Sequence, residues 1–328
     1  MKVVMLSLQD HTGSGYKITE AINLNTTNFV EYMVLLDDLS GHNAYKYPYL
    51  YSKKEGAKNG WSVPQRVLDH AQSIVDNADI IHLKGDELPK DRNFYGIMIP
   101  ENKPVIITVS GSFFRRGESN VAMPLNKISD YTDFANLVTA LTPGLNYKET
   151  NGIYTPHAID NRNINNLWKY SKVPIINHAY SGNNKKGTNE FLKTVKILKS
   201  EGLVFDVTIT KNITNAECLK QKSEATIFFD QISETGWFGM SGIEAISMGI
   251  PVISYISDKS KEQAGFGITP AIVNCGNTVE SLTDTLRIMI NHNKKQLSKM
   301  SKMSKTWAEK VYSYESCAKM WNGIYESM

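Results

Sequence analysis

The sequence predicts an α/β protein made of two doubly wound domains, each with a parallel sheet that helices cover on both faces. The chain has 328 residues, which is long for one ordinary core and suits two domains of roughly 150 residues each. Short runs rich in β-branched residues alternate with stretches of helical spacing in both halves. These runs are apolar throughout rather than at every second residue, which is typical of parallel strands buried on both faces.

The first half contains one such alternation. Five runs are predicted as parallel strands: KVVMLSL (2–8), NFVEYMVLL (28–36), DIIHLK (79–84), PVIITVSG (104–111) and LVTALTP (137–143). Residues 62–78 have apolar side chains at helical spacing and are predicted as a helix. From about residue 150 the sequence becomes polar and rich in asparagine, which indicates a crossing between domains.

The second half repeats the pattern. Its predicted strands are PIINHAY (174–180), FDVTIT (205–210), ATIFFDQ (225–231), PVISYI (251–256) and AIVNC (271–275). A helix is predicted over 189–202, where an apolar stripe ends at a glycine, and the tail from 279 onward is predicted as helical with a solvated, lysine-rich face. The expected division is a first domain over 1–155, a linker over 156–173, a second domain over 174–305, and a final helix over 306–328 that can cross back to the first domain.

Composition excludes several classes of protein. Hydrophobic residues make up 41% of the chain and charged residues 21%, as in folded globular domains. The net charge is +3, with 36 basic and 33 acidic residues mixed along the chain, and this balance does not indicate a nucleic-acid partner. The sequence shows no signal peptide and no run of roughly 18 apolar residues that could span a membrane. Three widely spaced cysteines suit a reducing compartment, so the expected location is the cytoplasm.

Two loops that follow predicted strands are candidate ligand loops, because ligands of doubly wound proteins bind at the carboxyl ends of the strands. The loop in QDHTGSGYKITEA contains Gly13 and Gly15, which allow a ligand to approach the backbone closely, although the full glycine spacing of a dinucleotide fingerprint is absent. The loop in HAYSGNNKKGTNEF places Lys186 at a helix start. A helix dipole disfavours a cation there, so we expect an anion nearby.

A third segment, GMSGIEAISMGIPVISY (239–255), allows two interpretations. Ser241 and Glu244 have the spacing of a capping box, in which both side chains satisfy amides at a helix start. Alternatively, a helix that begins at Gly239, Met240 and Ser241 offers its amides to a phosphate and places Glu244 beside the molecule that carries it. The segment by itself leaves both open.

Together these segments resemble the group-1 (GT4-like) family of retaining glycosyltransferases. The similar segments of the first half are NADIIHLKG, KPVIITVSGS and ALTPGLNYKETNGIYTPHAID, and those of the second half are NHAYSGNNKKGT and ATIFFDQISETGWFGMSGIEAISMGIPVISY. The last of these is the most specific. The resemblance covers almost the whole chain and implies the GT-B architecture, in which two Rossmann-like domains face each other across a cleft.

The resemblance implies that the two domains bind different substrates. The first domain would face the acceptor, and the second would bind a nucleotide-diphosphate sugar, UDP- or GDP-linked. Glu244 would accept hydrogen bonds from the ribose hydroxyls, while Lys186 and the amides from Gly239 to Ser241 would hold the diphosphate. Such donors stabilise the departing diphosphate without a metal. The sequence has no Asp-x-Asp pair, and neither a metal nor a tightly bound cofactor is expected.

Other residues are assigned by position. Gly13 and Gly15 are further candidates for contact with the diphosphate. The nucleobase is expected near Lys211 and Asn212, which follow the predicted strand over 205–210.

The chain departs from the family pattern at three places, one of which is the phosphate-binding arginine often found before the lysine-glycine loop, which is absent here. The family commonly has a glutamate eight residues before the ribose glutamate, where this chain has Gly236, and Glu234, two residues earlier, is either a substitute in contact with sugar or acceptor or a loop charge. The family's strand that ends in histidine-glycine reads Ser110 before its glycine, which leaves the donor sugar open. Arg115 and Arg116 are candidates for sugar or acceptor contacts, with a surface ion pair as the equal alternative.

Three residues are weak candidates for catalysis. His11 and His82 are expected near strand ends, although a lone histidine is more often structural. Asp10 could act as a base on the acceptor side if the reaction inverted configuration. The resemblance implies retention instead, in which the departing phosphate takes the acceptor proton, so no catalytic base is assigned.

The leading hypothesis is a retaining glycosyltransferase that acts on an intracellular acceptor. The acceptor stays open among a glycan or lipid-linked precursor, a small metabolite, and a modified base in DNA as in phage-type DNA glycosylation. Two alternatives are a sugar-nucleotide epimerase with the same architecture and a non-catalytic nucleotide-sugar binder. The sequence leaves the oligomeric state open.

Overall fold

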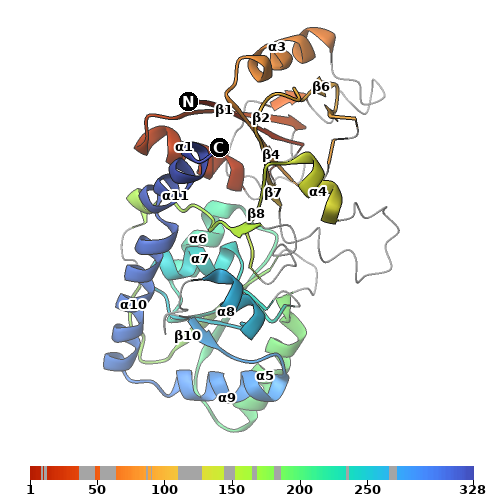
Figure 1. The fold of residues 1–328 in the computed structure, drawn as a ribbon. Coiled ribbons are helices and arrows are strands. Elements are labelled where there is room, and N and C mark those ends of the chain that lie inside the picture. The colour runs from red at the N-terminus through yellow and green to blue at the C-terminus, as the bar shows by residue number, and fades with distance from the viewer. Residues whose placement is uncertain are drawn as a thin grey trace. The chain divides into compact units, whose positions relative to one another are not determined.

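The structure is a computed structural model, and it has the predicted α/β class with parallel sheets (Figure 1). It describes the chain except residues 9, 11–12, 37–48, 52–63, 86–87, 90, 110–127, 144–151, 165–167, 181–185, 234–235 and 266–271. Two compact units divide it: unit 1 is Met1–Ala158 with Tyr314–Met328, and unit 2 is Ile159–Ser313. The domain limits given above stay predictions. None of the described helices is long and apolar enough to cross a membrane.

Unit 1 is built on a seven-stranded parallel sheet in the order β3-β2-β1-β4-β7-β8-β9. The strands are β1 (Lys2–Ser7), β2 (Phe29–Leu36), β3 (Tyr49–Tyr51), β4 (Ile80–Lys84), β7 (Val105–Val109), β8 (Leu137–Ala140) and β9 (Ile153–Tyr154). Five of them were predicted. β3 and β9 were missed, because strands of two or three residues show no pattern of burial.

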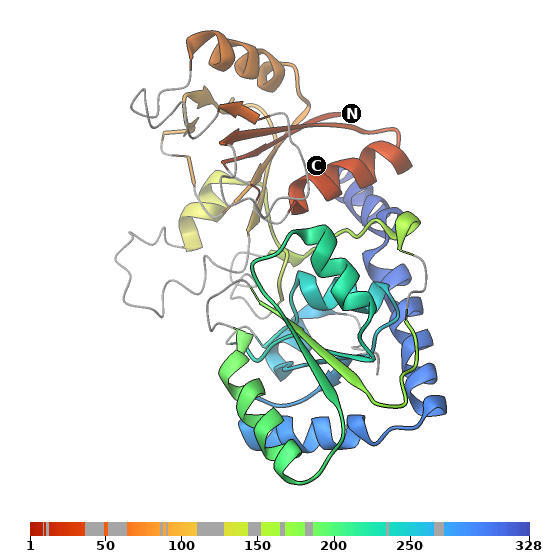
Figure 2. The same cartoon turned by 180° about the vertical axis from the view of Figure 1, so that it is seen from behind.

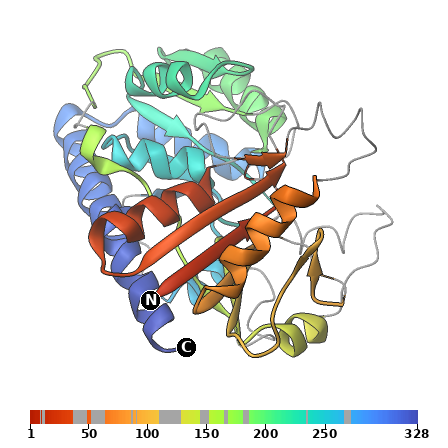
Figure 3. The ribbon, with the colours of Figure 1, turned by 90° about the horizontal axis from the view of Figure 1, so that it is seen from above.

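Helices cover both faces of this sheet. They are α1 (Ser14–Asn25), α3 (Gln65–Asp76), α4 (Ile128–Phe134) and α11 (Tyr314–Glu326). Successive residues of β1 point to opposite faces: Val4 joins the apolar cluster under α3, whereas Met5 joins the cluster under α1 and α11. Figure 3 shows α1 and α3 on opposite sides of the strands of unit 1. Burial on both faces explains why these strands are continuously apolar.

Unit 1 also contains a small antiparallel pair, β5 (Asn93–Phe94) with β6 (Ile97–Met98). The final helix α11 packs against α1, where the Tyr314 hydroxyl donates to a carboxylate oxygen of Glu20 at 2.7 Å. The last helix of the chain therefore belongs to the same unit as the first strand.

Unit 2 has a five-stranded parallel sheet in the order β11-β10-β12-β13-β14. The strands are β10 (Ile175–Ala179), β11 (Asp206–Thr210), β12 (Ile227–Phe229), β13 (Val252–Ser254) and β14 (Ile272–Asn274). All five were predicted, with ends a few residues longer than the structure shows.

Six helices and one short 3-10 turn, η2 (Asn161–Asn163), complete the described part of unit 2. The helices are α5 (Thr188–Ser200), α6 (Asn215–Ser223), α7 (Met240–Ser247), α8 (Asp258–Ala264), α9 (Val279–Ile290) and α10 (Lys294–Tyr312). α5 packs against α9, as Figure 2 shows, and α7 packs against α10. The rings of Phe191 and Phe229 stack at 4.9 Å between α5 and the sheet.

Candidate functional site

The candidate site of unit 2 lies where β10 and β12 end. These strands are parallel neighbours, so the segments that follow them lie at the same edge of the sheet. β10 leads to Lys186 and α5, and β12 leads to Asp230 and α7. A Cβ atom at Gly187 would lie 2.9 Å from the Cβ of Ile232, and the amide of Ile232 donates to the carbonyl of Lys186 at 3.1 Å. The two segments are therefore packed closely together.

Asp230, which sequence reasoning did not single out, connects these two segments. Its carboxylate is fully buried, accepts a hydrogen bond from the Gly239 amide at 2.6 Å, and lies 3.6 Å from the Lys186 ammonium. Burial raises the pKa of Asp230, although Lys186 and the Gly239 amide act in the opposite direction. A Cβ at Gly242 would lie 3.0 Å from the Asp230 Cγ, so glycine allows α7 to begin against this carboxylate. Asp230 thus fixes where α7 starts.

The start of α7 decides between the two interpretations of Glu244. Gly239 is the N-cap, and no side chain caps this helix. Ser241 is consequently the second helical residue and Glu244 the fifth, so the capping-box interpretation is wrong. The amides of Met240, Ser241 and Gly242 lie in the first turn, where an α-helix provides no acceptor for them. This helix start has the geometry of an anion site.

Glu244 is paired with a buried lysine instead. Its Oε2 lies 2.6 Å from the ammonium of Lys222 on α6, whose side chain is fully buried and also donates to the Ser241 hydroxyl at 3.0 Å. The ammonium lies 5.2 Å from the centre of the Phe228 ring. Because a buried ammonium without a counter-ion is costly, Glu244 has a structural role whatever else it binds. A carboxylate has about four lone-pair positions, so Glu244 can accept further hydroxyl groups while it keeps Lys222.

Lys211 and Asn212 follow β11, the neighbour of β10, at the same edge of the sheet. The Lys211 ammonium lies 5.2 Å from the centre of the Tyr180 ring, which stacks on His178 at 5.6 Å. Asn212 has a φ of 54°, a left-handed conformation that asparagine tolerates better than most residues. The structure therefore brings the expected nucleobase region to the edge that carries Lys186 and Glu244.

Gly236 lies where the backbone leaves little room for a side chain. Its φ is 54°, and a Cβ there would lie 2.5 Å from both the Cβ and the Oγ of Ser257. The Ser257 amide also donates to the Gly236 carbonyl at 2.9 Å. A glutamate at this position would require the segment around Ser257 to move.

Unit 1 places Asp10 at the start of α1. The carboxylate is buried and accepts hydrogen bonds from the amides of Ser14, Gly15 and Tyr16 at 3.1, 2.9 and 3.2 Å. It also lies 2.9 Å from the ammonium of Lys84, which is itself buried. Burial acts to raise the pKa of Asp10, but Lys84 and the hydrogen bonds outweigh it and lower the pKa. A carboxylate with a lowered pKa is a poor base.

Glycine suits the two positions of this loop for different reasons. Gly13 precedes α1 with a φ of 67°, in the left-handed region that glycine adopts readily. A Cβ at Gly15 would clash with the Tyr32 hydroxyl and lie 2.8 Å from the Lys84 side chain. Contact of these glycines with a diphosphate stays a prediction, and such an anion would have to compete with the carboxylate of Asp10.

His82 lies in the middle of β4 and is fully buried. Its Nδ1 is 2.9 Å from the Tyr325 hydroxyl and its Nε2 is 2.6 Å from the Thr108 hydroxyl. Burial, with a smaller effect of Lys84, lowers the pKa of His82 to about 3. The imidazole is therefore neutral, and its surroundings are those of a structural histidine.

The remaining predicted residues lie outside the described part of the chain: His11, Ser110, Arg115, Arg116 and Glu234. Among the described residues, no group of three or more His, Cys, Asp or Glu side chains could hold a metal ion.

No protein-family model and no curated protein matches the sequence. Solved structures match over the whole chain. A sucrose-phosphate synthase from Thermosynechococcus elongatus is 11% identical with a TM-score of 0.63, and the match covers 100% of this chain and 99% of that one. HepE from Anabaena in complex with UDP-glucose is 11% identical with a TM-score of 0.61, and the match covers 100% of both chains.

An α-glucosyltransferase in complex with UDP and a 13-mer DNA containing a central A:G mismatch is also 11% identical, with a TM-score of 0.63 and coverage of 99% of this chain and 98% of that one. At this level of identity the similarity shows the fold alone. The chain has the fold of the GT-B glycosyltransferases.

Proposed function

We propose that this protein is a glycosyltransferase that binds a nucleotide-diphosphate sugar on unit 2. One observation supports this most: the open start of α7 lies beside Lys186 and one helical turn before Glu244, at the carboxyl edge of a parallel sheet. A cation, helix-start amides and a hydrogen-bond acceptor are the groups that a nucleoside diphosphate needs. Solved structures of the same fold are described as complexes with UDP, UDP-glucose or ADP, which favours a donor of this chemical class.

In this proposal each part of the donor has its own contacts. The diphosphate binds the amides of Met240 and Ser241 and the ammonium of Lys186. The ribose hydroxyls donate to Glu244, which keeps its ion pair with Lys222. The base lies near Lys211 and Asn212.

The chemistry follows from the charge that develops on the departing group. Breaking the bond between sugar and phosphate leaves negative charge on the diphosphate, and Lys186 with the start of α7 is placed to stabilise it. We propose retention of configuration, with the departing phosphate taking the proton of the acceptor hydroxyl, so that the protein supplies no base. We also propose that the mechanism needs no metal, that the protein is located in the cytoplasm, and that it is related to the GT4-like enzymes.

Calorimetric titration with UDP, GDP, ADP and their glucose conjugates tests the donor site. Glu244→Gln alone is a confounded variant, because it leaves the buried Lys222 without its counter-ion and should cost about 3 kcal/mol of folding stability. The double variant Glu244→Gln with Lys222→Met removes both charges. We expect it to regain most of the melting temperature but not the nucleotide affinity.

Two results would overturn the proposal. One is a wild-type protein that binds none of these nucleotides. The other is a double variant that regains nucleotide affinity together with stability, which would make Glu244 purely structural. Incubation of the wild type with a bound donor, followed by mass spectrometry, then separates three activities: transfer to an added acceptor, epimerisation of the donor without acceptor, and binding without any product.

A further inference from the structure

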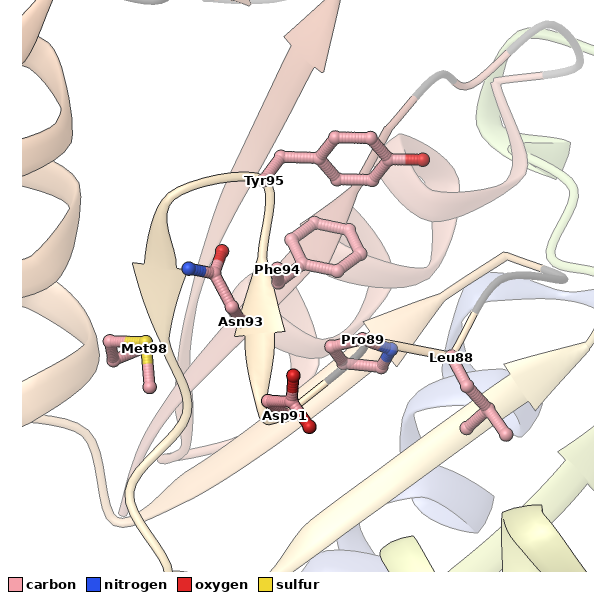
Figure 4. Close-up of a pocket in the computed structure, with 7 residues that line it drawn as sticks. All are labelled: Leu88, Pro89, Asp91, Asn93, Phe94, Tyr95 and Met98. Atoms are coloured by element: carbon pink, nitrogen blue, oxygen red, sulfur yellow. The ribbon is translucent and has the colours of Figure 1, made fainter.

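A cavity lies in unit 1, around the β5–β6 hairpin, and its lining shares no residue with the candidate donor site of unit 2. Its volume is about 590 Å³, within the usual range of small-molecule sites of roughly 300–1,000 Å³. Figure 4 shows the rings of Phe94 and Tyr95 at the hairpin and the carboxylate of Asp91 near Pro89. The described residues that line the cavity are Leu88, Pro89, Asp91, Asn93, Phe94, Tyr95 and Met98.

The turn of this hairpin is strained. Tyr95 and Gly96 form a two-residue loop with φ values of 54° and 95°, and a loop with both φ values positive favours Asn-Gly. A tyrosine in this conformation is costly, and its side chain, in a residue 44% exposed, gains little burial in return. Asp91 and Arg92 also have positive φ, so three of the four such non-glycine residues in the described chain lie in this one segment. Clustered strain of this kind is typical of functional sites.

The strained segment is held rigidly. The Arg92 guanidinium donates to the carbonyls of Ile99 and Pro100 at 2.8 and 2.9 Å and lies 4.8 Å from the centre of the Phe134 ring. The Gln72 side chain of α3 accepts from the Met98 amide at 2.7 Å and donates to its carbonyl at 2.9 Å. These contacts fix the backbone beside the cavity, which lowers the entropic cost of ordering it when a ligand binds.

The lining favours a sugar as the ligand. A pyranose ring has a face of C–H groups that packs on an aromatic ring, and a rim of hydroxyls that donate to a carboxylate. The Phe94 and Tyr95 rings meet edge to face at 5.3 Å, and Tyr95 is the more exposed of the two. The base of a nucleotide would also stack, but a nucleotide brings negatively charged phosphates. The described lining contains a carboxylate and no lysine or arginine, so it does not favour a nucleotide.

We propose that this pocket binds one pyranose unit of an oligosaccharide, with the Tyr95 ring against its C–H face and Asp91 accepting from its hydroxyls. That this oligosaccharide is the acceptor of sugar transfer rests on the proposed function. The binding itself does not.

The test is calorimetric titration of the full chain with maltopentaose, cellopentaose and mannopentaose. We expect Tyr95→Asn to weaken the binding of at least one of them by about tenfold, a loss of one aromatic contact. The melting temperature of Tyr95→Asn should stay equal or rise, because asparagine suits the turn. Tyr95→Phe keeps the ring and should keep the affinity.

Absence of oligosaccharide binding to the wild type, or unchanged affinity in Tyr95→Asn, would overturn the inference. So would a DNA duplex whose binding depends on Tyr95. Titration of the same variants with UDP separates the two proposals, since Tyr95→Asn should bind UDP as the wild type does. If the wild type binds oligosaccharide through Tyr95 but no nucleotide, the proposed function fails and this inference stands.

Discussion

Both units place a buried carboxylate between a sheet strand and the helix that follows it. In unit 1, Asp10 lies between β1 and α1 and pairs with Lys84. In unit 2, Asp230 lies between β12 and α7, with Lys186 nearby. The two carboxylates nevertheless leave their helices in different states.

Asp10 fills the start of α1, because it accepts hydrogen bonds from three consecutive amides at that start, and its pKa is lowered. Asp230 accepts from Gly239, the residue that precedes α7, and its Oδ1 lies 3.6 Å from the Lys186 ammonium. Its pKa is raised. Unit 1 thus satisfies its helix start with an anion of its own, whereas unit 2 keeps a helix start that can take the anion of a ligand.

Asp10→Ala should give the largest effect. It leaves the ammonium of Lys84 and the amides of α1 buried without their acceptor, and we expect the free energy of unfolding to fall by about 4 kcal/mol. Denaturant unfolding measures this. Asp10→Ala combined with Lys84→Met should recover part of the loss. A loss below about 1 kcal/mol, typical of a single neutral hydrogen bond, would contradict the view that Asp10 organises this helix start.

Mild acid should destabilise both units in the same direction. Burial lowers the pKa of His82 in unit 1 to about 3 and that of His178 in unit 2 to about 4. Histidine in the unfolded chain takes up its proton near pH 6.5. Between that pH and the lowered pKa values the unfolded state binds more protons than the folded state, so the free energy of unfolding decreases as the pH decreases. From pH 7 to pH 5 each histidine should remove about 2 kcal/mol.

Denaturant unfolding at pH 7, 6 and 5 checks this, with His82→Gln compared with the wild type. The variant should lose less stability on acidification by the share of one histidine. An identical pH dependence in the two proteins would show that His82 is not buried in its neutral form.

Apart from β3 and β9, the strands of both sheets were predictable, because burial on both faces leaves a largely apolar run in the sequence, as in β1, β7 and β12. The β5–β6 hairpin was not predictable. Each of its strands has two residues, and its turn has Tyr95 where the usual signal is asparagine.

The candidate site was predictable only where the residues that indicate it lie in one continuous segment of the sequence. The glycines before α1 and α7 indicated two helix starts. The sequence could not show that Asp10 fills the first, because that depends on how the loop folds back. Nor could it show that Lys222 is buried, because six of the nine residues of α6 are polar or charged and the partner Glu244 lies on another helix.

Lys186→Met tests the open helix start directly. Lys186 is partly exposed, with 23% of its side chain accessible, but its ammonium lies 3.6 Å from the buried Asp230 carboxylate, so its removal should cost about 1–3 kcal/mol of stability. Loss of a cation from the diphosphate should weaken UDP binding by about tenfold or more. Lys193→Met, on the exposed face of α5, removes the same charge and is the matched control. Equal UDP affinities in the two variants would remove Lys186 from the donor site.

Asp230→Asn should give the smallest effect on stability, and its matched variant in unit 1 is Asp10→Asn, which we expect to be destabilising as Asp10→Ala is. The pKa of Asp230 is raised above its ordinary value of 3.8, so the folded state binds this proton more tightly than the unfolded state does. The contribution of Asp230 to the stability of the protein is therefore lost as the pH rises through the raised pKa. Asparagine removes the buried charge while its Oδ1 can still accept from the Gly239 amide. At pH 7 we expect unchanged stability or a gain of up to about 1 kcal/mol, and tighter UDP binding because a negative charge beside the phosphates is gone. Denaturant unfolding and calorimetry on Asp10→Asn and Asp230→Asn measure both quantities. If Asp230→Asn were as destabilising as Asp10→Asn, the two carboxylates would have the same structural role. The start of α7 would then be occupied by a carboxylate of the protein itself, as the start of α1 is.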